Sequence, residues 1–239
     1  MKRNFFILCF LIFISKLYSL DVILNDMSKT INTRTDGNSD VFVFFLDNHP
    51  LVVNSQKSEI LINNQWKFLF DKTEDREILD TYAKYGVSVR NYIDTDNKYL
   101  YMEITSNIDN SLYYCFNFFI NDEQLVKKQL TRHEFEMKKD SLISLWQEFP
   151  ITLTDGSELQ FYNKFIKFGE YQKIFQIVNN KQNIDIFNFL QDYKMLGRPC
   201  INMEKNKIIC FACSKKNNEN KLFEDCNIFI FSIIYDENN

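Results

Sequence analysis

The sequence predicts an α+β fold made mostly of antiparallel β-strands, with sandwich-like sheets, about three short helices and a C-terminal hairpin held by disulfide bonds. Three observations predict it. Runs in which apolar and polar residues alternate recur through the 239 residues, and this alternation is typical of half-buried strands. The runs do not alternate regularly with helical segments, as they would in a doubly wound parallel sheet. Four of the six cysteines lie between positions 200 and 226, which is typical of a disulfide-bonded segment.

The N-terminal segment, residues 1–19, has the three parts of a secretory signal peptide. Lys2 and Arg3 precede an apolar run from Phe5 to Ile14, and Ser19 offers a cleavage point. The run is too short to span a bilayer comfortably; the alternatives are a short membrane anchor or a buried N-terminal strand. We therefore expect a mature chain 20–239 that is exported to the periplasm or outside the cell. No later apolar run reaches transmembrane length, so we expect no transmembrane span in the mature chain.

Strands are expected wherever short alternating or continuous apolar runs end at Asn, Asp, Gly or Ser. Their ranges are Val41–Leu46, Ile60–Ile62, Trp66–Phe70, Tyr99–Thr105, Leu112–Ile120, His133–Met137, Ile151–Thr154, Leu159–Phe168, Lys173–Val178, Ile208–Cys213 and Ile228–Tyr235. Asp155-Gly156 is a strong hairpin signal, and Asn63-Asn64 and Asp96-Asn97 are weaker turn signals.

Three helices are expected between these strands, each beginning at a capping residue ahead of apolar residues with helical spacing. They cover residues 73–86, residues 140–150, and a segment that starts at Asn183 or Asp185, passes Tyr193 and is closed by Gly197 and Pro199. No flexible linker is visible, so we expect one β-rich domain over residues 20–239. If the chain does divide, the boundary should lie near residue 150 or residue 197.

The clustered cysteines predict two disulfide bonds near the C-terminus, because an exported chain meets an oxidising environment. The candidates are Cys200, Cys210, Cys213 and Cys226. Three pairings are open, and we favour Cys213–Cys226 across the polar loop together with Cys200–Cys210. Cys115 lies in an apolar run and is expected to be a buried free thiol.

Two alternatives give the cysteines a chemical role. A zinc site could use the C-x-x-C pair Cys210 and Cys213, but a zinc ribbon needs a second such pair. A thioredoxin-like redox pair needs a helix after the motif, and here a polar loop and a strand follow. We therefore expect no metal and no cofactor.

Catalytic motifs are missing from the sequence, which has no nucleophile elbow, zinc-protease motif or phosphate-binding loop. Cys115 and His133 could form a nucleophile and base pair in space, whereas His49 precedes Pro50 at a turn. A segment from Asp36 to Asp47 superficially resembles a calcium loop, but its sixth position is Val41 where such loops need Gly. A polar turn is the preferred interpretation.

Exposed aromatic residues could present a flat face to sugars or to a partner protein. The candidates are Trp66, Trp146, Tyr99, Tyr101, Tyr113 and Tyr114. The alternative is that they fill the core of a chain with 24 Phe and 12 Tyr.

The tail from Phe223-Glu-Asp to Ile234-Tyr-Asp resembles the last strand of the spirochaetal flagellar outer-layer proteins, which are exported β-sandwiches. The likeness covers only residues 223–236, so no residue or role is transferred.

The formal net charge of −4 gives no basic footprint for nucleic acid. We therefore expect a non-enzymatic exported binding or structural protein of the cell envelope or secretome, with an envelope protein or a glycan as partner. The alternative is an exported hydrolase with a Cys–His or acidic site.

Overall fold

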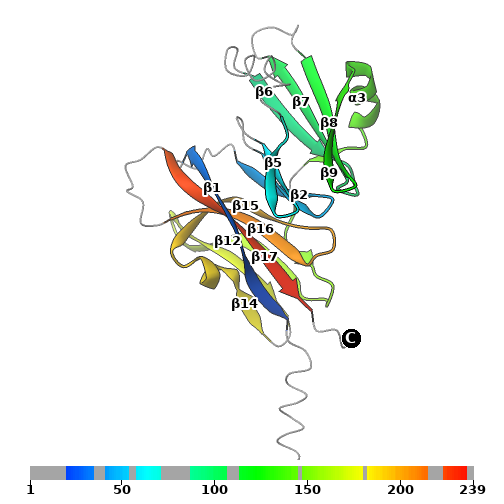
Figure 1. Cartoon of the computed structure of the whole chain (residues 1–239). Helices are drawn as coiled ribbons and strands as arrows, with labels where there is room; N and C mark the ends of the chain where they lie inside the picture. The colour runs from blue at the N-terminus through cyan, green and yellow to red at the C-terminus, as the bar shows by residue number, and fades with distance from the viewer. Residues whose placement is uncertain are drawn as a thin grey trace, which may run out of the picture.

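The computed structural model describes residues 20–34, 41–53, 58–70, 87–106, 113–144, 147–179, 182–214 and 223–235. In this part of the chain the strands form four antiparallel sheets (Figure 1). Sheet A contains, in spatial order, β1 (Asp21–Arg34), β17 (Phe223–Ile234), β16 (Lys207–Ser214) and β15 (Tyr193–Ile201). Sheet B contains β2 (Phe42–Leu46), β3 (His49–Val53), β4 (Glu59–Ile62) and β5 (Gln65–Phe68).

The other two sheets come from the middle of the chain. Sheet C contains, in spatial order, β10 (Ile143–Ser144), β6 (Val87–Ile93), β7 (Tyr99–Ser106), β8 (Tyr113–Asn121) and β9 (Gln124–Leu130). Sheet D contains β11 (Ile151–Thr152), β12 (Glu158–Lys167), β13 (Glu170–Val178) and β14 (Asn183–Asp185). The mostly antiparallel β prediction is therefore confirmed, and none of the described helices is long and apolar enough to cross a membrane.

Sheet A is the central layer, because both of its faces are buried. One face packs with sheets B and C around a first core, and the other packs against sheet D around a second core. In β16, Ile209 and Phe211 enter the first core, whereas Ile208 and Cys210 enter the second. Side chains alternate between the two faces of a strand, so a strand buried on both sides reads as a continuous apolar run.

Helix α3 (Arg132–Lys139) covers the outer face of sheet C, where Phe135 packs with Tyr101, Cys115 and Leu130 (Figure 1). This segment was expected to be a strand from His133 to Met137, and that expectation is wrong. A capping box starts the helix: the Glu134 N–H donates to Thr131 Oγ1 at 3.2 Å, and the Thr131 N–H donates to the Glu134 carboxylate at 2.7 Å. Of the apparently alternating residues only Phe135 is buried.

The expectation of about three helices is not met. Residues 143–144, within the expected second helix, form strand β10, and residues 147–150 are not helical. In the expected third helix, Asp185 does cap a helix, but it is the short 3₁₀ helix η1 (Ile186–Leu190). Gly197 and Pro199 lie inside β15, where Gly197 has φ +71° next to a register shift. Residues 73–86, the expected first helix, lie outside the described residues.

The turn predictions are confirmed where the structure describes them. Asn63 and Asn64 both have positive φ and connect β4 to β5. A two-residue hairpin with a type I′ turn requires positive φ at both positions. Asn97 has φ +55° in the turn between β6 and β7. Asp155 accepts the Ser157 N–H at 3.0 Å, and Gly156 has φ +82°, in the turn between β11 and β12.

Candidate functional site

The expected disulfide bond between Cys213 and Cys226 is present. The two residues are directly opposite one another on β16 and β17, and both are buried in the first core. The bond therefore joins β16 and β17, the last two strands along the chain, covalently within sheet A.

The second expected bond, Cys200–Cys210, does not form, and both residues are buried free thiols. Cys200 is opposite Ile209 in the ladder between β15 and β16. Since Cys210 is the next residue along β16, its side chain points to the other face of the sheet. Cys200 accordingly lies in the first core and Cys210 in the second.

The alternation of side chains between the two faces of sheet A also separates the two cysteines of the C-x-x-C motif. Cys210 and Cys213 are three positions apart on one strand, so their sulfurs lie on opposite faces of sheet A. They cannot share a metal ion or form a redox pair in this arrangement. Within the described ranges, no group of three or more His, Cys, Asp or Glu side chains is placed to hold a metal ion.

Cys115 and His133 are not brought together. Cys115 faces α3 from β8 and is completely buried, whereas His133 is on the exposed side of that helix, two residues from buried Phe135. Burial, helped by the nearby Glu103 carboxylate, raises the pKa of the Cys115 thiol to about 12. A thiol with so high a pKa is a poor nucleophile at neutral pH.

The remaining sequence candidates also lie apart. His49 begins β3, and its Nδ1 is 2.7 Å from the Asp47 carbonyl oxygen. The first five residues of the calcium-like segment, 36–40, lie outside the described residues, and strand β2 occupies most of the rest.

The candidate aromatic face is not assembled from its described members, of which Tyr99 is 39% exposed and packs against the Phe119 ring. Tyr101 packs under α3, whereas Trp66 packs against the first core. Tyr113 and Tyr114 are consecutive on β8, so they point to opposite faces of sheet C. Trp146 lies outside the described residues.

A different set of apolar side chains is exposed, at the tip of the β12–β13 hairpin. Its members are Tyr162, Phe165, Ile166, Phe168 and Tyr171, which are between 46% and 99% exposed. Phe168, in the turn, is the extreme case at 99%. Single exposed apolar residues need no explanation, but several large apolar side chains exposed on one short segment are unusual on a protein surface.

The hairpin extends beyond the core that supports it. Phe161 and Phe175 face each other across the two strands and pack in the second core. Further along the same face, Phe165 and Tyr171 are also opposite one another, with ring centroids 5.7 Å apart, but both are exposed. The pairing of β12 with β13 continues as far as Lys167 and Glu170, so the hairpin tip (residues 162–171) is an ordered projection.

A pocket of about 470 Å³ lies beside the hairpin, where short strand β14 ends. β14 pairs only with residues 176–178 of β13, and the pocket opens along the rest of that edge. Its lining is mostly apolar and comes from β13, η1 and β15. The lining includes Phe175, Phe187, Leu190, Tyr193 and Met195.

Two lysines lie at this pocket. Lys173 Nζ donates to the Met195 carbonyl at 3.2 Å, which joins β13 to β15. Burial, and then the neighbouring charge of Lys194, lower the pKa of Lys173. Neither lysine forms an ion pair with a carboxylate whose side chain the structure describes. Asp185 also lines the pocket, but its carboxylate accepts the Phe187 N–H at 2.9 Å.

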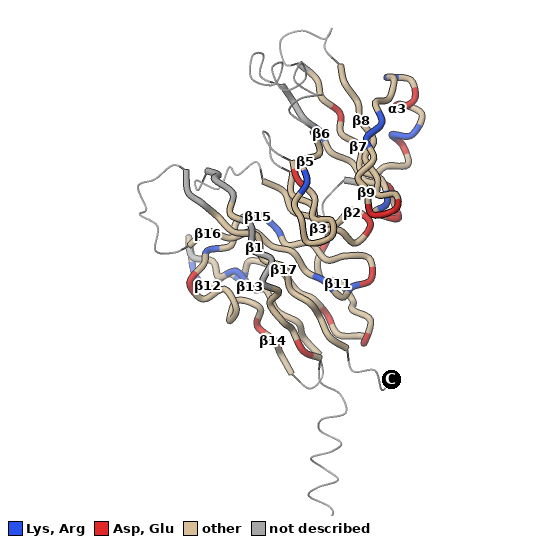
Figure 2. Tube along the Cα trace, in the orientation of Figure 1, with Lys and Arg blue, Asp and Glu red and all other residues tan. Residues whose placement is uncertain are grey.

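Cations gather at this end of an otherwise acidic chain. Lys164 and Lys167 are exposed on the hairpin, and Lys173 keeps part of its side chain in water although its Nζ is held at the Met195 carbonyl. Figure 2 shows blue segments along β12, β13 and β15. Sequence reasoning identified both strands but missed the surface, because Phe165 and Tyr171 continue the alternation of the buried residues. The available signal was that apolar residues continue to the end of β12, at Ile166, and into the turn, at Phe168.

No known protein family matches this chain, and no curated protein matches it in sequence.

Proposed function

We propose that this chain is an exported, non-enzymatic binding protein of the cell envelope, and that it binds its partner through the hairpin tip and the adjoining pocket. The observation that carries the proposal is the exposure of Phe165, Ile166, Phe168 and Tyr171 on one ordered projection. Exposing these side chains to water is unfavourable by roughly 1.5–3 kcal/mol each relative to full burial. A partner that covers them would recover part of that free energy.

Export is supported by two independent features. The signal-like segment 1–19 predicts it, and the Cys213–Cys226 bond is of a kind that persists in oxidising compartments. The intact mass of the natively produced protein tests export directly. A mass that begins near Leu20 supports it, and a full-length chain with all its thiols reduced contradicts it.

A non-enzymatic role is supported by the separation of the candidate catalytic groups. Cys115 is buried with a raised pKa, and His133 is on the exposed side of α3. The exported-hydrolase alternative predicts that Cys115→Ser and His133→Ala each abolish an activity while the protein stays folded. The binding proposal predicts that both variants bind the envelope as the wild type does.

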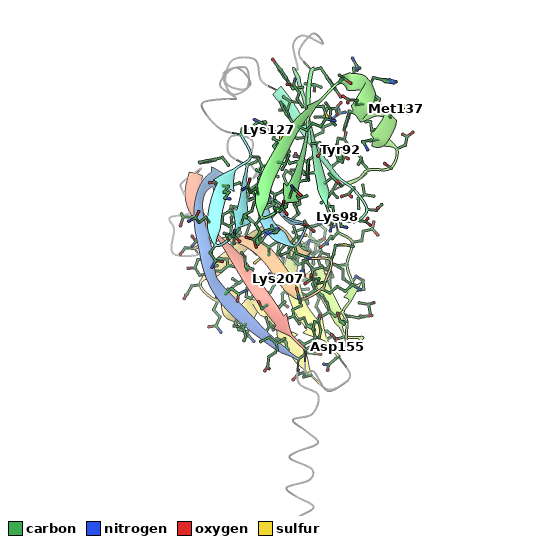
Figure 3. The ribbon with its side chains drawn as sticks, turned by 45° about the vertical axis from the view of Figure 1, so that its right-hand side comes forward. Tyr92, Lys98, Lys127, Met137, Asp155 and Lys207 are labelled. Atoms are coloured by element: carbon green, nitrogen blue, oxygen red, sulfur yellow. A yellow bond between two sulfur atoms is a disulfide. The ribbon has the colours of Figure 1, made fainter. Side chains whose placement is uncertain are left out.

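The main test is co-sedimentation of the mature protein with the envelope fraction of the cells that produce it. We expect the wild type to co-sediment and Phe168→Ser to lose most of its binding. Phe168 is 99% exposed, so its replacement should leave the fold unchanged. The matched control is Met137→Ser, which removes a side chain 74% exposed on α3, at the opposite end of the molecule from sheet D (Figure 3).

Each result decides the proposal. Loss of binding in the hairpin variant but not in the Met137 variant supports it. Equal binding by all three proteins shows that the hairpin is not the binding surface. Failure of the wild type to co-sediment shows that the envelope is not the target.

A further inference from the structure

We infer that the hairpin tip inserts into the headgroup region of an anionic lipid bilayer. This inference rests on the proposed function and names the class of partner. It is argued from the shape of the tip, from the faces on which its apolar side chains lie, and from the positions of its lysines.

The apolar side chains surround the tip, and this favours a partner that can enclose it. Phe165 and Tyr171 are on the face that continues the core side of sheet D, while Tyr162 is on the opposite face. Phe168 is in the turn that joins the strands. A bilayer interface would enclose Phe168 in the turn together with the ring pair behind it, whereas Tyr162, further from the tip, would stay outside the inserted part.

The backbone of the hairpin suits shallow insertion. The ladder between β12 and β13 runs from the Glu158–Val178 pair to the Lys167–Glu170 pair, so the backbone groups between the strands already have partners. This matters because unsatisfied backbone groups are costly where water is scarce. Amphipathic elements at a membrane surface typically bury their apolar side by roughly 5–10 Å, and strand residues rise about 3.3 Å each. That depth covers Phe168, Ile166, Phe165 and Tyr171.

With the tip inserted, the lysines of the hairpin would lie at the level of the lipid headgroups. Lys164 is opposite Gln172, and Lys173, whose Nζ donates to the Met195 carbonyl, is opposite Asn163. The two lysines are thus behind the Phe165–Tyr171 pair and on opposite faces of the hairpin. Long cationic side chains can keep their charge among headgroups while their stems pack on apolar surface. The chain as a whole is acidic, with a formal net charge of −4, so attraction to an anionic surface would come from local groups of lysines such as this one.

The test uses vesicles of phosphatidylcholine alone and vesicles that contain 30% phosphatidylglycerol. The wild-type mature protein should bind the anionic vesicles, and 0.5 M salt should weaken that binding because it screens the lysines. Phe168→Ser and Lys164→Glu should each reduce binding by about tenfold or more, and Met137→Ser should not change it. Urea unfolding of each variant checks that the fold is kept.

A tryptophan reporter tests insertion itself. In Phe168→Trp the new indole should shift its emission to the blue with anionic vesicles and should be quenched by lipids brominated near the headgroup end of the acyl chain. Met137→Trp should show neither change.

Two outcomes overturn the inference. The first is that the protein binds no vesicle although Phe168→Ser still abolishes its binding to the envelope. This outcome is clearest if protease treatment of the envelope also abolishes binding of the wild type. The partner is then an envelope protein, and the proposed function survives without the lipid. The second is that vesicles bind equally to wild type, Phe168→Ser and Lys164→Glu, which places lipid contact elsewhere on the chain.

Discussion

Asn202 is a buried polar side chain that connects sheet A to sheet B. It is 1% exposed, and its Oδ1 accepts the backbone N–H groups of Asn206 and Lys207 at 3.0 and 2.8 Å. Its Nδ2 donates to Asn48 Oδ1 at 3.0 Å and to Asn206 Oδ1 at 2.7 Å. Because Asn48 belongs to the β2–β3 turn, this amide ties the turn after β15 to sheet B.

Asn202→Ala should therefore lower the free energy of unfolding by about 2 kcal/mol, because two backbone donors lose their acceptor in a partly buried turn. Urea denaturation of the variant measures this loss. The matched control is Asn163→Ala, which removes an exposed amide and should change stability by less than about 0.5 kcal/mol. Equal effects of the two substitutions would contradict the role given to Asn202.

The three free thiols should be unreactive in the native protein. Burial raises the pKa of Cys115 and of Cys200 to about 12, and it also raises the pKa of Cys210. Because the thiolate is the reactive form, iodoacetamide at neutral pH should label none of them before unfolding. Mass spectrometry of the mature chain should count three labels after unfolding without reductant and five after reduction. One label after unfolding without reductant would mean that Cys200 and Cys210 are bonded after all.

At the scale of elements, the strands that could be predicted are those with a clear alternation or a turn signal beside them. β7, β8, β12 and β16 belong to this group. β1 and β9 were missed because they are edge strands of sheets A and C, and an edge strand with many polar residues has no distinct apolar face. β15 was missed because Gly197 and Pro199 are typical of a chain break.

The helix at Thr131 shows how a local capping signal can outweigh an apparent alternation. Thr131→Ala should destabilise the protein by about 1 kcal/mol, because it removes the hydrogen bond at the helix N-terminus. Glu136→Gln, on the same helix, affects only an exposed pair with Lys139 at 3.8 Å and should have a smaller effect.

The capping box also has a pH dependence. Hydrogen bonds from the backbone and side chain of Thr131 lower the pKa of Glu134 from its ordinary value of 4.5. A carboxyl whose folded pKa is lowered stabilises the fold above its unfolded pKa, and this contribution is lost as the pH falls through the folded pKa. An NMR titration should show the pKa of Glu134 moving part of the way back up in Thr131→Ala, which removes the hydroxyl donor but keeps the backbone N–H. An unchanged pKa in that variant would contradict the assignment.

For the whole molecule, the decisive feature is that sheet A belongs to both large cores. Sheet B packs on one side of it, with sheet C contributing to the same core, and sheet D packs on the other side. The chain also closes on itself there, because N-terminal β1 pairs with C-terminal β17. Neither relation could be predicted from the sequence, since both depend on contacts between residues far apart in the chain. The position of the hairpin tip beyond the second core depends on the same layering, and this is why exposed Phe165 resembled buried Phe161.

A shared central sheet predicts that residues 20–239 unfold in one cooperative transition. Ile230 and Phe231 are neighbours on β17 that enter the first and the second core respectively, and both are at most 2% exposed. Replacing either by Ala should cost roughly 2–5 kcal/mol. In a Trp146→Phe background the fluorescence of Trp66, which packs against the first core, reports on that core alone. If unfolding is cooperative, Phe231→Ala in the second core lowers the urea midpoint reported by Trp66 fluorescence in the first core. The midpoint reported by circular dichroism then falls by the same amount. If Trp66 keeps its wild-type midpoint while the circular dichroism transition splits, the two sides of sheet A unfold independently and the chain contains two domains.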